Sequence, residues 1–285
     1  KITSSNAFWI SVFLTIAGIG ILYTINYKTA FSNRNPDEIT PVMRANITKT
    51  LARALTTLEA KTEPEHTALV VVDVQNDFCA EGGMLDTEGF DLTRIQTMVP
   101  RLVNLISKAR EAGCLIVYIQ TIYNAEMNLM SDVWLEQSLR QWKGRFIEYP
   151  VCMQGGWGGD FYDGIKPLPG EPIIHKHRYG GFIGTNLDMV LRSNGIRSLI
   201  MTGAITNGCV ESTARDGFFH DYYIVFAEDC TGTVNEDMHN ATLVNIDRWF
   251  GQVVKAEEVI TCWHDSGKLG DEVEGKIKAL TKIKK

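Results

Sequence analysis

The chain has 285 residues, of which 45% are hydrophobic and 22% are charged, a composition typical of a folded globular protein. Its formal net charge of −6 at pH 7 is unfavourable for binding a phosphate backbone, so no nucleic-acid partner is expected. The six cysteines are scattered, and none forms a Cys-x-x-Cys pair. This spacing argues against a structural zinc site and against a disulfide framework.

The N-terminal segment, residues 1–30, contains an apolar run at 7–25 without a charged residue. About nineteen such residues are just enough to span a bilayer as a helix. More Lys and Arg residues follow this run than precede it, and the positive-inside rule then predicts a cytoplasmic-facing domain after it. We therefore expect a single-pass membrane anchor, with a cleaved signal peptide or a packed globular helix as alternatives.

Residues 31–63 are predicted to be a polar linker followed by an amphipathic helix. The helix is inferred from apolar residues at helical spacing, namely Ile47, Leu51, Leu55 and Leu58. We expect it to pack on the domain or on a neighbouring subunit, which indicates a homo-oligomer. At the other end of the chain, residues 264–285 are polar and rich in lysine and are predicted to form a frayed tail.

Residues 64–263 are predicted to form one α/β domain, because short β-branched runs alternate with helical patterns along them. Strands are expected at 68–72, 114–120, 172–175, 198–201, 222–226 and 252–254. Helices are expected at 92–112, 131–142, 185–193, 210–220 and 235–250. Strands that alternate with helices are joined by crossovers, so we predict a doubly wound, mainly parallel sheet flanked by helices on both faces.

The stretch from residue 198 to 217 places a cysteine where a strand turns into a helix. An apolar run leads into small, turn-prone residues, and the helical pattern starts at Cys209. The N–H groups and the positive dipole end of a helix favour a thiolate, and the same N–H groups can hold an oxyanion. The pattern resembles a nucleophile elbow with sulfur in place of oxygen, although a free cysteine can equally be a small buried hydrophobe.

Three predicted strands end in chemically useful residues: Asp73, Lys176 and Cys209. Parallel strands bring their carboxyl ends to one edge of the sheet, where ligands bind. A carboxylate there can take the proton of the thiol and later deliver it to a leaving amine. An ammonium between them favours the ionised forms of both. These residues predict acyl transfer from an amide to the thiol, followed by hydrolysis.

The residues that carry this chemistry resemble those of the isochorismatase-like cysteine hydrolases over about residues 65–262. The similarity lies in Val-Val-Val-Asp-Val-Gln-Asn-Asp-Phe around Asp73, in Lys-His-Arg-Tyr-Gly-Gly-Phe from Lys176, and in Thr-Gly-Ala-Ile-Thr-Asn-Gly-Cys-Val-Glu-Ser up to and past Cys209. The resemblance implies a triad in which Asp73 is the proton shuttle, Lys176 its charged partner and Cys209 the nucleophile. It also implies a cis peptide at Ala204–Ile205, with an oxyanion hole formed by the N–H groups of Ile205 and Cys209.

Within that family, the sequence is most similar to ureidoacrylate amidohydrolases, which implies cleavage of a C–N bond in a small ureido compound with release of ammonia. Hydrolysis of another small carboxamide, such as a biuret-like or nicotinamide-like compound, is the alternative. The Asp-x-His metal motif of the nicotinamidases is absent after the second strand, so neither a metal nor another cofactor is expected. Polar and aromatic residues near the strand ends are candidate substrate contacts: Gln75, Gln120, Tyr123, Tyr179 and Phe182.

A catalytically silent, membrane-tethered binding protein with the same fold is the rival from another functional class. It would keep the architecture, but it would not require a carboxylate, an ammonium and a thiol at one edge of the sheet. The presence of all three in the sequence favours the enzyme.

Overall fold

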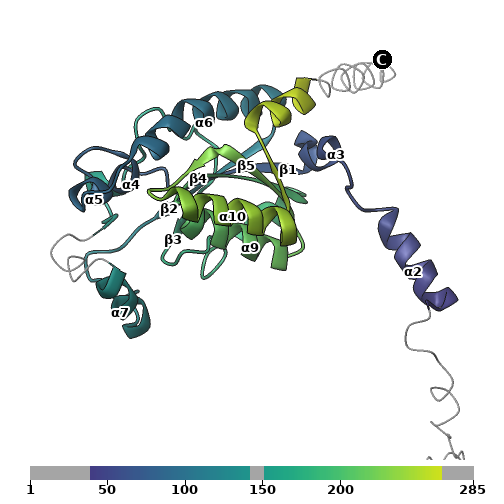
Figure 1. Ribbon diagram of the computed structural model, residues 1–285, viewed down its shortest axis with the longest axis horizontal. Helices are drawn as coiled ribbons and strands as arrows, with labels where there is room; N and C mark the ends of the chain where they lie inside the picture. The colour runs from purple at the N-terminus through teal and green to yellow at the C-terminus, as the bar shows by residue number, and fades with distance from the viewer. Residues whose placement is uncertain (1–38, 142–150, 265–285) are drawn as a thin grey trace, which may run out of the picture. The chain divides into compact units, whose positions relative to one another are not determined.

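The computed structural model describes residues 39–141 and 151–264 of the chain (Figure 1). It divides into two units, residues 1–54 and residues 55–285. The predicted membrane anchor at 7–25 and the tail beyond His264 lie outside the described residues. Of the helices in the described ranges, none is both long and apolar enough to cross a membrane.

In the first unit, α2 (Pro41–Leu51) is a helix without a buried residue. The Thr40 hydroxyl caps it by accepting a hydrogen bond from the Met43 N–H at 3.2 Å. The predicted helix running from Ile47 through Leu58 is wrong, because α2 ends at Leu51. Leu55 belongs to the second unit, where its N–H donates to the Tyr223 hydroxyl at 3.0 Å.

The second unit is built on a six-stranded sheet in the order β3-β2-β1-β4-β5-β6, and every pairing is parallel. The strands are β1 (Thr67–Val72), β2 (Leu115–Thr121), β3 (Ile173–Lys176), β4 (Ser198–Ala204), β5 (Tyr223–Gly232) and β6 (Gln252–Val254). The chain adds strands to one side of β1 and then, from β4, to the other. This reversal places the topological switch point between β1 and β4, where open parallel sheets bind ligands. The predicted fold class is confirmed.

Helices cover both faces of the sheet (Figure 1). One hydrophobic cluster joins Leu69 and Val71 of β1 to α6 (Thr93–Ala112). The other joins Ala68 and Val70 to the helices of the second face, which are α8 (Leu187–Ser193), α9 (Glu211–Phe219) and α10 (Glu236–Trp249). Because successive side chains of a strand point to opposite faces, β1 is buried on both sides and reads as an uninterrupted apolar run.

Two connections complete the unit. The long segment before β3 carries α7 (Asp132–Gln141), whose first turn the Ser131 hydroxyl caps, and a short 3-10 turn at Trp157–Gly159. Between β1 and α6 lie two single-turn helices, α4 (Asn76–Cys79) and α5 (Met84–Thr87).

The unit begins earlier than the expected start at residue 64. Before β1 lie α3 (Leu58–Thr62) and a 3-10 turn at Pro64–His66. The Trp263 indole N–H donates to the Thr62 carbonyl at 2.8 Å, which ties α3 to the helical residues 256–264. Strands β4 and β5 also run past the predicted ends at 201 and 226. Beyond a bulge, Gly203 and Ala204 pair with Thr231 and Gly232.

Candidate active site

Four neighbouring strands bring their carboxyl ends together at one edge of the sheet. Asp73 follows β1, Thr121 ends β2, Lys176 ends β3, and β4 leads into the turn that carries Cys209. Asp73 turns the chain there with a φ of 47°, and its N–H still donates to the Ile119 carbonyl of β2 at 2.9 Å. A positive φ is uncommon outside glycine and clusters at functional sites, where surrounding structure holds the residue in place.

Lys176 is the centre of the site, and its side chain is 1% exposed. The ammonium nitrogen lies 2.7 Å from Asp73 Oδ2, donates to Thr121 Oγ1 at 2.8 Å and to the Arg178 carbonyl at 2.9 Å, and lies 3.3 Å from Cys209 Sγ. The predicted triad residues are therefore in direct contact. A buried ammonium is tolerated only when it is paired and hydrogen-bonded, and these contacts satisfy that condition.

The Asp73 carboxylate is completely buried, and its two oxygens differ in their surroundings. Oδ2 accepts from Lys176 and from the Thr121 hydroxyl at 3.1 Å. Oδ1 has no hydrogen-bond partner among the described residues. An unpaired buried carboxylate oxygen is costly in a purely structural role, but it is suited to receive a proton.

Cys209 lies in a turn of π-helix, η4 (Thr206–Val210), that joins β4 to α9. Burial, followed by the charge of Asp73, raises the pKa of the thiol to about 12, although Lys176 acts in the opposite direction. Desolvation of the thiolate and the charge of Asp73 thus oppose the effects of the turn and the ammonium, which favour a thiolate. A thiol with a raised pKa needs a base to lose its proton.

The pKa of Lys176 is raised above its usual value. Burial alone would lower it, but the Coulombic attraction of Asp73 and then Cys209, together with hydrogen bonds to both, outweighs burial. Lys176 therefore acts as a permanent cation beside the thiol.

The peptide bond between Ala204 and Ile205 is cis, as the resemblance implied. It stands directly before η4, so Ile205 and Cys209 lie at the start and near the end of one tight turn. The Ile205 carbonyl accepts the N–H groups of Gly208 at 3.0 Å and Val210 at 3.3 Å. The backbone of the turn is thus folded onto itself beside the Lys176 ammonium.

Two of the five predicted substrate contacts, Tyr123 and Tyr179, lie together in an aromatic cluster with a residue that sequence reasoning missed. The Trp134 indole of α7 donates to the Tyr123 hydroxyl at 2.9 Å, and its ring meets that of Tyr179 edge-on at 4.6 Å between centroids. Burial raises the pKa of both tyrosines, and the charges of Lys176 and Cys209 contribute to both shifts. Arg178, whose carbonyl accepts from Lys176 at 2.9 Å, has its guanidinium 5.3 Å from the centroid of the Trp134 ring, which places this cluster next to the triad.

The other three predicted contacts have different surroundings. Both amide hydrogens of Gln75 go to backbone carbonyls, those of Thr121 and Gly159, and Gln120 donates to the same Gly159 oxygen at 2.7 Å. These two glutamines tie the long loop to the sheet. Phe182 stacks on His220 at 4.8 Å and packs in the core cluster of α8 and α9. These contacts pack and position the three side chains, and their role as substrate contacts stays a prediction.

Thr121 was missed, although it fits the rule that found the triad. It ends a strand next to β1, and its hydroxyl bridges Asp73 and Lys176. Searching every predicted strand end for a hydroxyl would have found it. Among the described residues, no group of three His, Cys, Asp or Glu side chains is arranged to hold a metal ion.

Comparison with known proteins assigns the chain to a family. The Isochorismatase domain matches residues 67–258, which includes all three triad residues. The chain belongs to the isochorismatase family. The ureidoacrylate amidohydrolase RutB of Enterobacter sp. (strain 638) is 38% identical over 218 residues, which cover 70% of this chain and 92% of that protein. The family match and this relative confirm the expected enzyme class, a hydrolase of non-peptide C–N bonds.

Solved structures of other isochorismatase-family proteins have the same fold. A cysteine hydrolase from Pseudomonas syringae pv. phaseolicola 1448A superposes with a TM-score of 0.64 at 24% identity, covering 75% of this chain and 97% of that one. The N-carbamoylsarcosine amidase of Thermoplasma acidophilum superposes with a TM-score of 0.53 at 29% identity, covering 67% of this chain and 96% of that one.

Proposed function

We propose that this isochorismatase-family protein is a cysteine-dependent amidohydrolase that cleaves a small ureido compound of the ureidoacrylate type. The observation that carries the proposal is the contact of the Lys176 ammonium with both Asp73, at 2.7 Å, and Cys209, at 3.3 Å. A carboxylate, a cation and a thiol in one buried site are the groups that amide cleavage through a thioester requires.

In the first half of the reaction, Asp73 Oδ1 takes the thiol proton as Cys209 Sγ attacks the ureido carbonyl carbon. The negative charge that develops on the carbonyl oxygen is held by the N–H groups of Ile205 and Cys209. When the tetrahedral intermediate collapses, the C–N bond breaks and Asp73 returns the proton to the leaving nitrogen. A thioester on Cys209 and a neutral amine result.

In the second half, water replaces the amine. Asp73 takes a proton from the water as the oxygen attacks the thioester carbon, and the proton then goes to the Cys209 sulfur as the C–S bond breaks. Lys176 stays charged throughout and compensates the negative charge that alternates between the carboxylate and the sulfur. The carbamate product decomposes to ammonia and carbon dioxide.

The substrate class is supported by two relatives whose names carry ureido or carbamoyl substrates, ureidoacrylate and N-carbamoylsarcosine. Next to the triad, Trp134, Tyr123 and Tyr179 offer flat surfaces and hydroxyl groups. Such a wall suits a planar, conjugated molecule with hydrogen-bonding groups at its ends. A ureidoacrylate has this form.

An ammonia-release screen tests the proposal. We expect turnover of ureidoacrylate with kcat/KM at least about tenfold above biuret, nicotinamide and simple N-carbamoyl amino acids, since a matched hydrogen-bonding and stacking site discriminates by at least that factor. Incubation with a chelator followed by gel filtration should leave the rate unchanged. Preferential turnover of nicotinamide would contradict the substrate class, and a rate that vanished with chelator and returned with zinc would contradict the metal-free mechanism.

The rival binding protein makes the opposite prediction in the same assay, which is ligand binding without ammonia release.

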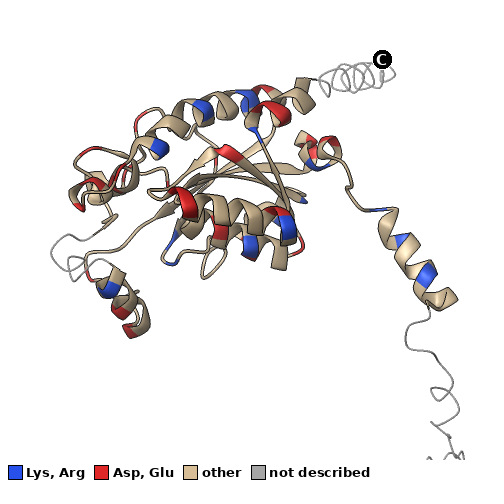
Figure 2. Cartoon of the chain, in the orientation of Figure 1, with Lys and Arg blue, Asp and Glu red and all other residues tan. Residues whose placement is uncertain are grey.

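The homo-oligomer and the membrane anchor stay predictions. Large apolar side chains on α9 and α10, such as Phe219 and Trp249, are more than 60% exposed, which supports an oligomer. Over the helices of the second unit, Lys and Arg residues are interspersed with Asp and Glu residues (Figure 2), and the absence of a nucleic-acid partner also stays a prediction.

A further inference from the structure

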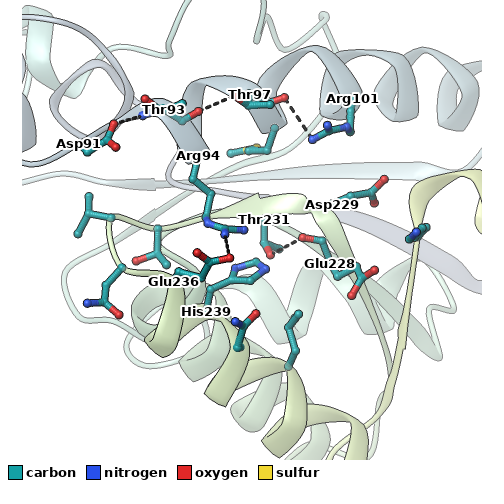
Figure 3. Close-up of a pocket in the computed structure, with 17 residues that line it drawn as sticks. Asp91, Thr93, Arg94, Thr97, Arg101, Glu228, Asp229, Thr231, Glu236 and His239 are labelled. Atoms are coloured by element: carbon teal, nitrogen blue, oxygen red, sulfur yellow. Dashed lines mark hydrogen bonds and ion pairs between the residues drawn. The ribbon is translucent and has the colours of Figure 1, made fainter.

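A cavity of about 850 Å³ lies away from the triad, on the β5 side of the nucleophile turn. It is lined by the start of α6, the end of β5 and the first turns of α10 (Figure 3). The guanidinium of Arg94 pairs with Glu236 at 2.8 Å across it, and His239 lies below this pair. His239 is 5% exposed, and the reaction proposed above does not use it.

His239 contacts the turn that carries the nucleophile. Its Nδ1 lies 3.0 Å from the hydroxyl oxygen of Thr206, the first residue of η4, and this threonine is completely buried. Burial and then Arg94 lower the pKa of His239, against the effect of Glu236, so the imidazole is neutral near pH 7. The Nδ1 atom of a neutral imidazole can accept a hydrogen bond that the Thr206 hydroxyl donates.

Among the described residues, few other side chains hold the turn on the side that faces α10. Gly208 has no side chain, and a Cβ built there would meet only Ile205, at 4.0 Å. Asn207 is exposed, and its amide oxygen accepts from the Thr233 hydroxyl at 2.7 Å. The contact of Thr206 with His239 is thus a buried hydrogen bond that links the turn to α10, in addition to the one that the Thr213 hydroxyl of α9 donates to the Cys209 carbonyl at 2.7 Å. A hydrogen bond in a low-dielectric interior is strong.

We propose that His239 is a positioning residue of the active site, which acts through Thr206 to hold the turn from Ile205 to Cys209 in its reactive geometry. The hydrogen bond anchors the turn from α10, while Lys176 contacts it from β3. Without it, the turn would keep its fold, but the nucleophile and the proposed oxyanion donors would sample positions displaced from the reacting carbonyl. The kinetic consequence rests on the proposed function; the anchoring itself does not.

Five variants test the inference in the full chain. His239→Leu and Thr206→Val should each lower kcat for ureidoacrylate by about tenfold to a hundredfold with KM changed less than about twofold, because displacement of catalytic groups by an ångström has effects of this size. His239→Asn, whose amide places a polar atom where Nδ1 lies, should recover most of kcat, whereas His239→Gln, which reaches the position of Nε2, should not. The double variant His239→Leu/Thr206→Val should be no slower than either single variant.

The control is Asn240→Ala, since Asn240 is exposed and lines the same cavity; its rate should equal that of the wild type. Amide hydrogen exchange in a peptide spanning 205–211 gives a readout that does not depend on turnover. It should accelerate in His239→Leu and Thr206→Val but not in His239→Asn or Asn240→Ala. Equal losses in the Leu and Asn variants, additive losses in the double variant, or unchanged exchange would overturn the inference. A wild-type protein without ureide hydrolysis would instead overturn the proposed function, and the exchange experiment would still decide the anchoring.

Discussion

Cys209→Ala is expected to abolish ureide hydrolysis while the protein still folds. The variant removes the atom that forms the thioester, and loss of a catalytic nucleophile lowers kcat by roughly 10⁴-fold or more. Folding should survive because the buried Asp73–Lys176 pair keeps its 2.7 Å contact and Lys176 keeps its bonds to Thr121 and the Arg178 carbonyl. Ammonia release measures the first expectation, and thermal unfolding measures the second.

Cys114→Ala is the matched control, because Cys114 is another buried free cysteine and lies next to the start of β2, at the opposite edge of the sheet. It should keep wild-type turnover. Hydrolysis by Cys209→Ala above about one per cent of the wild-type rate would remove the sulfur from the mechanism, since a nucleophile cannot be dispensed with at so small a cost. Mass spectrometry after rapid acid quench should find the acyl group on Cys209 in the wild type and in Cys114→Ala, and no acyl group in Cys209→Ala.

The triad was predictable because its signal is local. Asp73 directly follows an apolar run and Lys176 ends one, while Cys209 starts the helical pattern that comes after a third. Such runs are typical of strands, and parallel strands present their ends at one edge. Neither step requires knowledge of which strands are neighbours. Thr121 satisfies the same local rule, and the structure adds only the reason to single it out, namely its contacts with Asp73 and Lys176.

The substrate contacts were harder to predict because the direction of a side chain depends on distant partners. The Gln75 side chain donates a hydrogen bond to the Gly159 carbonyl, more than eighty residues later in the chain. The ring of Phe182 stacks on that of His220, which belongs to another element. The length of β5 was underestimated for the same reason. Glu228 and Asp229 are polar and lie within a bulge, and only beyond it do Thr231 and Gly232 pair with β4 again, a pairing that no local pattern reveals. Leu55 fits a helical spacing, yet a bond to Tyr223 places it in the other unit.

Asp73→Asn should separate the two roles of the carboxylate, which are proton transfer and its effect on the pKa of the Cys209 thiol. The amide keeps the shape of the side chain but cannot shuttle a proton, so ammonia release should fall by about 10²–10⁴-fold, the range for loss of a general acid–base. Reaction of Cys209 with iodoacetamide near pH 7 should instead become faster. Burial and then the charge of Asp73 raise the pKa of the thiol, and Lys176 lowers it. With the carboxylate neutralised, the ammonium stabilises the thiolate alone.

The pH dependence of the alkylation rate shows whether Asp73→Asn lowers the pKa of the Cys209 thiol. With a thiol pKa of about 12 in the wild type, the alkylation rate should rise about tenfold per pH unit from pH 7 to 10, because only the thiolate reacts. In Asp73→Asn the rise should level off at lower pH. Asp163→Asn, which changes an exposed carboxylate, should match the wild type in both assays. If Asp73→Asn lost alkylation and hydrolysis together while keeping its thermal unfolding temperature, Asp73 would be needed to form the thiolate and not only to relay its proton. If it lost neither, the proton would travel through another group, and the opposing effects of Asp73 and Lys176 on the thiol would not govern catalysis.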